Sequence, residues 1–191
     1  MKDFEYRFIP ADAYTDADRD AITGLWLSVW PDHNREYYTE NMARTAEISG
    51  DLPTGYPGFW KGDRIAAVAL VFPREIQTPR GSFTVMALSG VCVNPDLRGQ
   101  GLGAGVVKKA FSFVGQGTYP VNLFQTSFRV APFYKDLGCR RVNNSFINSL
   151  PPEKTDPETL RHSVFWDEVA MIYPADFDWP AGQIDLRGPG Y

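Results

Sequence analysis

Residues 86–114 have the sequence MALSGVCVNPDLRGQGLGAGVVKKAFSFV, and this stretch decides the fold. Its first part, Met86–Val93, is a mainly apolar run that predicts a buried strand. Asn94-Pro95-Asp96 ends the strand, because proline donates no hydrogen bond to a sheet and Asn and Asp favour turns. A glycine-rich loop, Arg98–Gly103, then leads into a segment whose apolar residues recur at helical spacing as far as Val114. We therefore predict a strand, a tight loop and a helix, in that order.

The loop has the features of an anion-binding site. Glycine lets the backbone turn sharply and gives a ligand close access to N–H groups. The first N–H groups of a helix have no intrahelical partner, and the helix dipole adds about half a positive charge there. Arg98 adds a fixed positive charge. The loop lacks the Gly-Lys-Ser/Thr ending of a nucleotide P-loop, and its alternating glycines do not match a dinucleotide-binding motif.

The composition is typical of a soluble globular protein, with 43% hydrophobic and 22% charged residues in 191. The formal net charge of −4 and the lack of a Lys/Arg-rich run argue against a nucleic-acid partner. The negative net charge instead favours a cationic small-molecule partner through electrostatic steering. No apolar run approaches the ~20 residues of a membrane span, and the first residues lack the apolar core of a signal peptide. We therefore expect a cytoplasmic protein with no membrane partner.

Cysteine and histidine are scarce in the chain. Cys92 and Cys139 are expected to be free thiols in a reducing compartment. Neither has a histidine neighbour or metal-ligand spacing, and the only histidines are His33 and His162. We therefore expect no metal site and no Cys-His nucleophile.

The rest of the chain alternates between predicted strands and helices. The expected strands are Phe4–Ile9, Pro57–Trp60, Ile65–Phe72, Ser82–Val93, Val121–Thr126, Arg141–Leu150 and His162–Ile172, with a loop at Pro151–Asp156. Besides the helix after the loop, the expected helices run from a cap at Asp16 or Asp18 to about Val29, over Arg35–Ile48, and from Pro132 to a stop at Gly138. The strands before and after the central helix are expected to be parallel, because a helix crosses between them.

Two segments resemble signatures of the GNAT N-acetyltransferases. Arg98-x-x-Gly101-x-Gly103, after a Val-Cys-Val strand end, resembles the acetyl-CoA-binding motif of that family. The segment with Phe133 and Tyr134, which ends at Leu137-Gly138, resembles its second signature. The resemblance implies a GNAT-like α/β (α+β) fold: a mixed, mostly antiparallel twisted sheet with a central splayed parallel strand pair, flanked by about four helices. It implies a single domain over residues 1–172, with 173–191 as an irregular tail packed on that domain.

The same resemblance implies acetyl-CoA as the cofactor and gives roles to individual residues. In the family, the strand end pairs with the pantetheine arm and the loop binds the pyrophosphate. The cofactor-binding residues implied here are Val91, Cys92, Val93, Arg98, Gly99, Gln100, Gly101, Leu102, Gly103, Gln125 and Ser127. The N–H of Val93 is expected to polarise the thioester oxygen, and Tyr134 to protonate the leaving sulfur.

The final stretch resembles one branch of the family. Asp178-Trp179-Pro180-Ala181-Gly182 is similar to the C-terminal end of the aminoglycoside 2′-N-acetyltransferases, which implies Asp178 and Trp179 as acceptor-binding residues. Asp32, in the break between the first two predicted helices, is either a helix cap or a further acceptor-binding residue. Three positions depart from the family pattern: Ser127 replaces a common Asn, Cys139 replaces an aromatic residue, and Ser89 stands about where that branch carries a carboxylate. The general base therefore stays open between a water ordered by Ser89 and the carboxylates of Asp32, Asp178 and Asp185.

These observations favour an acetyl-CoA-dependent N-acetyltransferase that acts on a primary amine of a small cationic acceptor, such as an aminosugar, by direct attack in a ternary complex. Two alternatives remain open. One is an acetyltransferase of a protein or peptide amine or of a polyamine. The other is a non-catalytic acyl-CoA-binding sensor, which the departures at Ser89 and Ser127 favour. The sequence does not set the length of the acyl group. Exposed sheet edges and the apolar, Pro-rich tail are compatible with a homodimer.

Overall fold

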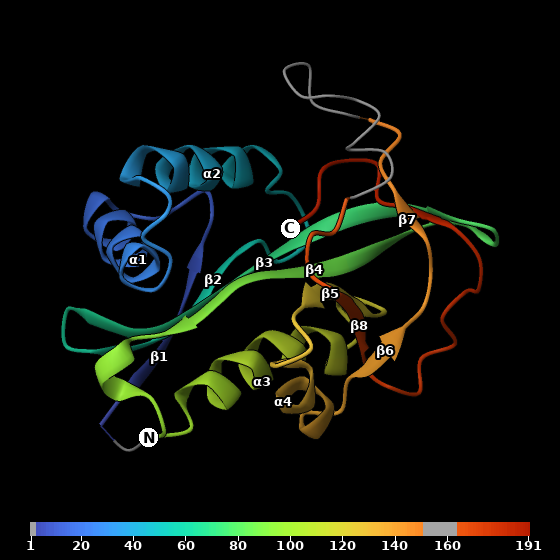
Figure 1. Ribbon diagram of the computed structural model, residues 1–191. Coiled ribbons are helices and arrows are strands. Elements are labelled where there is room, and N and C mark those ends of the chain that lie inside the picture. The colour runs from blue at the N-terminus through green and yellow to red at the C-terminus, as the bar shows by residue number, and fades with distance from the viewer. Residues whose placement is uncertain (1–2, 151–163) are drawn as a thin grey trace. The chain divides into compact units, whose positions relative to one another are not determined.

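The computed structural model describes residues 3–150 and 164–191 of the chain (Figure 1). The chain forms two compact units, Met1–Phe72 with Leu88–Thr118 and Pro73–Ala87 with Tyr119–Tyr191. Two long strands, β3 (Arg64–Thr78) and β4 (Gly81–Val93), contribute residues to both units.

The first unit contains strands in the order β1-β2-β3-β4. β1 (Glu5–Pro10) pairs antiparallel with β2 (Gly55–Lys61), and β2 pairs antiparallel with β3. Between β1 and β2, the chain forms α1 (Asp16–Val29) and α2 (Arg35–Glu47). Both helices were predicted. The predicted end of α2 lies one residue after its observed end at Glu47.

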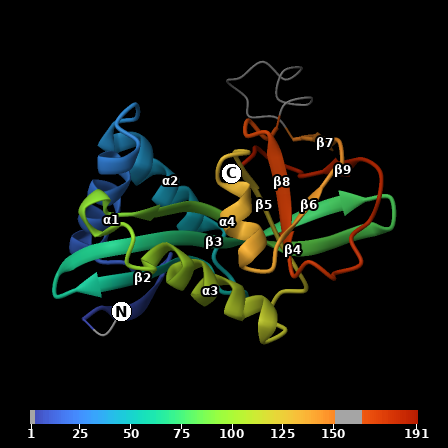
Figure 2. The same cartoon turned by 60° about the horizontal axis from the view of Figure 1, so that its bottom comes forward.

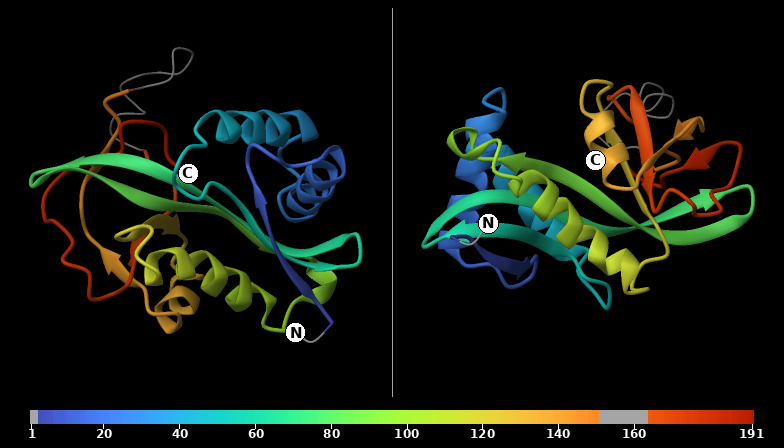
Figure 3. Two further views of the ribbon diagram at one scale, coloured as in Figure 1. Left: turned by 180° about the vertical axis from the view of Figure 1, so that it is seen from behind. Right: turned by 90° about the horizontal axis from the view of Figure 1, so that it is seen from below.

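Helices cover both faces of the sheet in this unit (Figure 3). On one face, α1 and α2 contribute Ile22, Trp26 and Met42 to a buried apolar cluster. On the other face lies α3 (Leu102–Gly115), where the rings of Phe113 and Phe8 are 5.3 Å apart. Strands that are covered on both faces are buried throughout, which explains the nearly continuous apolar sequence of β3 in this unit.

A capping box sets the start of α1. The Thr15 hydroxyl accepts a hydrogen bond from the Asp18 N–H at 3.2 Å, and the Asp18 carboxylate accepts one from the Thr15 N–H at 3.0 Å. The expectation that Asp16 or Asp18 caps this helix is therefore wrong. Thr15 is the cap, because its hydroxyl reaches the third helical residue while Asp18 reaches back.

The second unit contains strands in the order β3-β4-β5-β8-β6. β5 (Asn122–Thr126) pairs antiparallel with β8 (Val169–Tyr173), and β8 pairs antiparallel with β6 (Arg140–Val142), so that β8 lies between the other two (Figure 2). The chain passes from β5 to β6 through α4 (Ala131–Asp136). This helix begins and ends close to the predicted Pro132 and Gly138.

The predicted parallel pair is present in this unit. β4 and β5 pair in parallel through Met86–Asn122 and Ala87–Leu123. The buried Asn122 side chain donates a hydrogen bond from Nδ2 to the Met86 carbonyl at 2.7 Å. The described residues therefore confirm the fold class: a mixed, mostly antiparallel sheet with a central parallel pair, and four α-helices. No helix in this described part is long and apolar enough to cross a lipid bilayer.

The prediction of one strand over Arg141–Leu150 is wrong. The segment forms β6 and a separate two-residue strand, β7 (Phe146–Ile147), which pairs with β9 (Ile184–Asp185) instead of β8. The chain turns between them because the Asn144 side chain donates hydrogen bonds to the carbonyls of Pro180 and Gly182, at 3.0 and 2.7 Å.

The prediction of a strand over His162–Ile172 is also wrong at its start. His162 and the loop Pro151–Asp156 lie outside the described residues, and 164–168 contain no strand. The strand begins only at Val169, because the Asp167 N–H donates to the side chain of Gln125 at 2.8 Å and not to a neighbouring strand.

The C-terminal stretch was expected to contain no regular element, but it forms β9, which pairs with β3 and β7. Ile184 and Leu186 are completely buried, and Trp179 is nearly so. Its indole N–H donates to Asn144 Oδ1 at 2.7 Å. These contacts attach the stretch to the second unit. The division into one domain and a tail stays a prediction.

Candidate functional site

The loop between β4 and α3 has a conformation that requires glycine. It begins with η1 (Pro95–Leu97) and contains Gly99 and Gly101, with φ angles of +80° and +78°. These angles lie in the left-handed region, which other residues seldom adopt. Apart from its chain neighbours, a Cβ at either position would have no atom of the described residues within 4 Å. Backbone conformation, and not crowding, therefore calls for glycine, and the space beside both residues is open.

The N-terminus of α3 is suited to an anion. Gly101 occupies the N-cap position, and no side chain in the described part of the chain forms a capping hydrogen bond there. The first turn of this 14-residue helix contains no acidic residue, and Arg98, Gly99 and Gln100 beside it are exposed. Its N–H groups and dipole therefore face the loop without a competing negative charge from the first turn.

The end of β4 is shaped by Trp26 of α1. Gly90 has φ +57°, and its carbonyl accepts a hydrogen bond from Trp26 Nε1 at 3.0 Å. A Cβ on Gly90 would lie 3.1 Å from the Trp26 ring, so a larger residue would push the ring aside, and the positive φ also favours glycine. This contact fixes the backbone immediately before Val91–Val93, the segment expected to face the cofactor. Trp26 lies among the buried residues of α1, and nothing in the local sequence indicates a partner 64 residues away.

The predicted residues of this strand end alternate in burial. Ser89, Val91 and Val93 are half-buried, and Cys92 between them is buried. Both cysteines are free, as predicted. Burial raises the pKa of Cys92 despite the opposing charge of Arg98, and it raises the pKa of Cys139 to about 12. Both thiols are therefore neutral at physiological pH and are poor nucleophiles.

In the second unit, α4 holds Tyr134 in a buried position. Its ring lies 4.5 Å from that of Phe124 on β5 and 5.0 Å from that of Phe133, measured between centroids. Burial, helped by the charges of Cys139 and Asp167, raises the pKa of Tyr134. A phenol with a raised pKa stays protonated near neutral pH and is available as a proton donor.

Gln125 and Ser127 are already engaged in structural contacts. Gln125 Nε2 donates to the Tyr191 carbonyl at 2.8 Å, and its Oε1 accepts from the Asp167 N–H. The Ser127 carbonyl accepts hydrogen bonds from the N–H groups of Val130 and Ala131, both at 3.0 Å. Their predicted role in cofactor binding stays a prediction.

The carboxylates named as candidate bases lie in different parts of the fold. Asp32 is exposed between α1 and α2. Asp178 is exposed and pairs with Arg80, in the turn between β3 and β4, at 2.7 Å. Asp185 is partly buried, which would raise its pKa, but hydrogen bonds from Ser149 and the Arg187 N–H outweigh burial and lower it. Asp178 and Asp185 therefore have structural partners within the second unit. Trp179 is likewise committed to its contact with Asn144.

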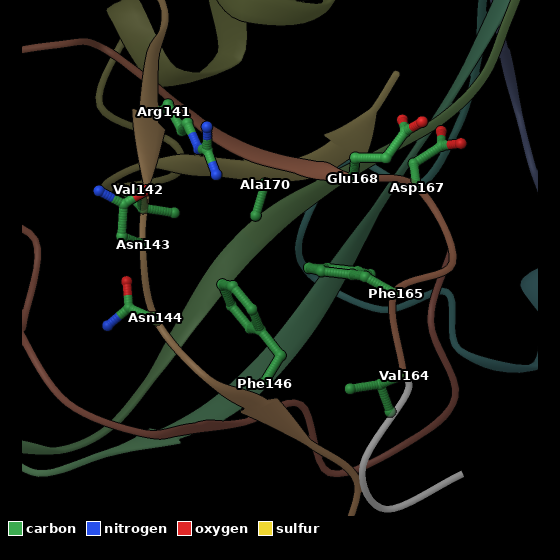
Figure 4. Close-up of a pocket in the computed structure, with 10 residues that line it drawn as sticks. All are labelled: Arg141, Val142, Asn143, Asn144, Phe146, Val164, Phe165, Asp167, Glu168 and Ala170. Atoms are coloured by element: carbon green, nitrogen blue, oxygen red, sulfur yellow. The ribbon is translucent and has the colours of Figure 1, made fainter. Parts of the chain in front are cut away.

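A pocket of about 320 Å³ in the second unit contains residues that sequence reasoning missed (Figure 4). Asp167 and Glu168 lie side by side at one edge, the Arg141 guanidinium lies across from them, and Phe146 and Phe165 line the floor. The only signal in the sequence was an acidic pair inside a predicted strand. Among residues 3–150 and 164–191, no group of three or more His, Cys, Asp or Glu side chains is placed to hold a metal ion.

The family model of the acetyltransferase (GNAT) domain matches residues 11–142, which is more than half of the chain. The chain therefore belongs to the GNAT acetyltransferase domain family. A comparison with curated proteins gave no match.

Solved structures share the fold. A GCN5-related N-acetyltransferase from Kribbella flavida superposes with a TM-score of 0.59 at 17% identity, over 73% of this chain and 34% of that one. An acetyltransferase of the GNAT family from Staphylococcus aureus MU50 superposes with a TM-score of 0.58 at 12% identity, over 88% of this chain and 98% of that one. An acetyltransferase from Trypanosoma brucei superposes with a TM-score of 0.57 at 19% identity, over 74% of this chain and 95% of that one. The present chain thus spans about a third of the Kribbella protein.

Proposed function

We propose that this chain is an acetyl-CoA-dependent N-acetyltransferase that acts on a primary amine of a small cationic acceptor. The observation that carries the proposal is the open loop Arg98–Gly103 in front of the uncapped N-terminus of α3, in a chain of the GNAT family. A pyrophosphate group is the part of CoA that such a site suits best.

The loop fits that group by shape and by charge. No atom from elsewhere in the described part of the chain occupies the side of Gly99 and Gly101 where a Cβ would project, so an anion can approach the backbone N–H groups closely. Arg98 is exposed beside them and adds a guanidinium group. In the proposed role, Arg98–Gly103 hold the pyrophosphate, and the backbone of Val91–Val93 holds the pantetheine arm. When bound, acetyl-CoA supplies the activated acetyl thioester.

The protein's own contribution to the chemistry is polarisation and proton transfer. We assign the Val93 N–H to the thioester oxygen, a contribution of about 2.7–4 kcal/mol where comparable donors have been removed. Tyr134 protonates the leaving sulfur, which its raised pKa supports. Acceptor deprotonation falls to a water ordered by Ser89 or to a carboxylate. Direct attack requires no acyl-enzyme, and the two buried neutral thiols are unsuited to forming one.

The acceptor is proposed only as a class. The net charge of −4 favours a cation, and the resemblance at Asp178-Trp179 favours an aminosugar. The partners of Asp178 and Trp179 in the second unit give both residues a structural function as well, so this resemblance alone does not select the acceptor. A peptide amine or polyamine acceptor and a non-catalytic sensor remain the alternatives.

The test is thiol release from acetyl-CoA with a panel of aminosugars, aminoglycosides, polyamines and lysine peptides. Release with an amine, together with an acetylated product and no acylated protein by mass spectrometry, supports the proposal. An enzyme that binds acetyl-CoA but releases no thiol with any amine would instead support the sensor. An acetyl group on Cys92 or Cys139 would contradict direct transfer.

A further inference from the structure

The pocket beside β8 has a defined place on the sheet of the second unit. In antiparallel strands, residues directly opposite each other point to the same face. Phe124 and Met171 are opposite each other, and Phe124 packs on Tyr134, so this pair faces α4. Gln125 and Ala170 are the next pair, and they face the other side of the sheet. Ala170 and its opposite residue Val142 line the pocket from the face away from α4, while Arg141, which is opposite Met171, reaches the pocket from the α4 side.

Contacts connect this pocket to the end of β5. Asp167 at its edge donates its N–H to the Gln125 side chain at 2.8 Å, and the Asp167 charge is close enough to raise the pKa of Tyr134. The Asp167 carboxylate thus connects the pocket electrostatically to the tyrosine proposed as the proton donor.

Among the described residues that line the pocket, acidic side chains outnumber basic ones. Asp167 and Glu168 bring two carboxylates and Arg141 brings one guanidinium, while Glu168 also accepts a hydrogen bond from the Phe128 N–H at 3.4 Å. Among the described residues, the half-buried Asp167 carboxylate has no hydrogen bond or ion pair of its own. Burying such a group without a partner is unfavourable, so a cation at this place would be stabilised. Burial, followed by the neighbouring Glu168, also raises the pKa of Asp167.

The floor and the size of the pocket restrict its occupant. The rings of Phe146 and Phe165 are 4.9 Å apart and offer an apolar surface, while the exposed Asn143 amide and the charged groups surround it. This combination suits a ring with an apolar face and polar edges. A volume of about 320 Å³ is near the lower end of ligand pockets. It equals roughly ten water molecules of ~30 Å³ each, which is enough for one sugar-sized ring.

We propose that this pocket is the acceptor site, and that it takes a single-ring, hydroxylated monoamine of the amino-sugar class, with Asp167 and Glu168 holding its ammonium group. That the bound amine is an acetyl acceptor rests on the proposed acetyltransferase function. That the pocket binds such an amine does not. A second ammonium group on the ligand would meet Arg141, so the pocket selects monocations over polyamines.

The experiment measures binding separately from catalysis. Saturation-transfer NMR compares D-glucosamine with N-acetyl-D-glucosamine, which has the same ring without the charge, and with tobramycin and spermidine as polycations. The variants are Asp167→Asn and Glu168→Gln, with Asp176→Asn as the matched control, because Asp176 is exposed in the same unit and outside the pocket. Asp167→Asn keeps the backbone N–H that contacts Gln125, so it tests the charge without removing that hydrogen bond.

We expect D-glucosamine to bind at least ten times more tightly than N-acetyl-D-glucosamine. Asp167→Asn should weaken it roughly tenfold to a hundredfold, the usual cost of losing a hydrogen bond to a charged group. Asp176→Asn should not weaken it, and the KM for acetyl-CoA should stay the same in every variant. Unchanged D-glucosamine binding in Asp167→Asn, or tighter binding of tobramycin or spermidine, overturns the pocket assignment. Loss of D-glucosamine binding in Asp167→Asn, with no thiol release from any amine, would support the pocket as an amine site while removing the proposed function.

Discussion

Replacing Gly101 by alanine separates the anion-binding role of the loop from its role in folding. Alanine in the left-handed region costs about 1–2 kcal/mol. A loss of unfolded-state entropy returns about 0.4–1 kcal/mol, which leaves a net destabilisation of roughly 0.5–1.5 kcal/mol. For a chain of this size, that corresponds to a fall in Tm of about 1–6 °C. The new methyl group meets no other part of residues 3–150 and 164–191 within 4 Å besides its chain neighbours, so folding survives, but it stands where a phosphate would approach.

Gly117 provides a matched control for this substitution. It has the same φ of +78°, and a Cβ there also meets nothing within 4 Å, but it follows the C-terminal end of α3. Gly101→Ala and Gly117→Ala should therefore lower the Tm by similar amounts. By titration calorimetry, only Gly101→Ala should weaken acetyl-CoA, by roughly tenfold to a hundredfold, as expected for the loss of one hydrogen bond to a charged group. Equal acetyl-CoA affinities in the two variants would refute the reasoning.

Three further changes test other parts of the account. Tyr134→Phe should lower kcat by about 10²–10⁴-fold while acetyl-CoA binding stays intact, and an unchanged kcat would remove Tyr134 from the chemistry. Trp26→Phe should cost about 1–3 kcal/mol in urea unfolding, because the Gly90 carbonyl loses its donor. Trp60→Phe is its control and should cost less, since Trp60 is equally buried and its Nε1 has no hydrogen-bond partner in the described part of the chain. Burial raises the pKa of Cys139 from 9.0 to about 12, so between pH 9 and 12 unfolding releases a proton from this thiol. The free energy of unfolding should therefore fall as the pH rises from 9 to 12, and it should fall less steeply in Cys139→Ala.

The sequence predicted the parts of the fold that depend on local pattern. Glycine at 99 and 101 signals a left-handed backbone, and the apolar spacing after it signals α3, so the strand, loop and helix were all correctly placed. The crossover through α3 also predicted that the strands before and after it are parallel, and the pairing of Ala87 with Leu123 confirms this. These features are decided by a few consecutive residues, which is why the sequence carries them.

The features that the sequence did not predict depend on distant partners. Asn144 ends β6 because it bonds carbonyls about 36 positions later, and the apolar residues after it look like a continuing strand. The C-terminal β9 forms only because β3 and β7 offer edges to it. Asp167 looked like part of a strand, and its place at a pocket follows from the side chain of Gln125. The hydrogen bond from Trp26 to the Gly90 carbonyl likewise joins residues 64 positions apart, which the local sequence does not indicate.

The central claim is that residues 98–103 and the start of α3 hold the pyrophosphate of CoA. The most direct test is calorimetric titration of the wild-type protein with acetyl-CoA and with S-acetylpantetheine, which lacks the pyrophosphate and the nucleotide. A second acetyl-CoA titration contains inorganic pyrophosphate as a competitor. The account predicts that acetyl-CoA binds, that S-acetylpantetheine binds at least a hundredfold more weakly, and that pyrophosphate competes with acetyl-CoA. Equal affinities for the two thioesters, with no competition by pyrophosphate, would contradict it.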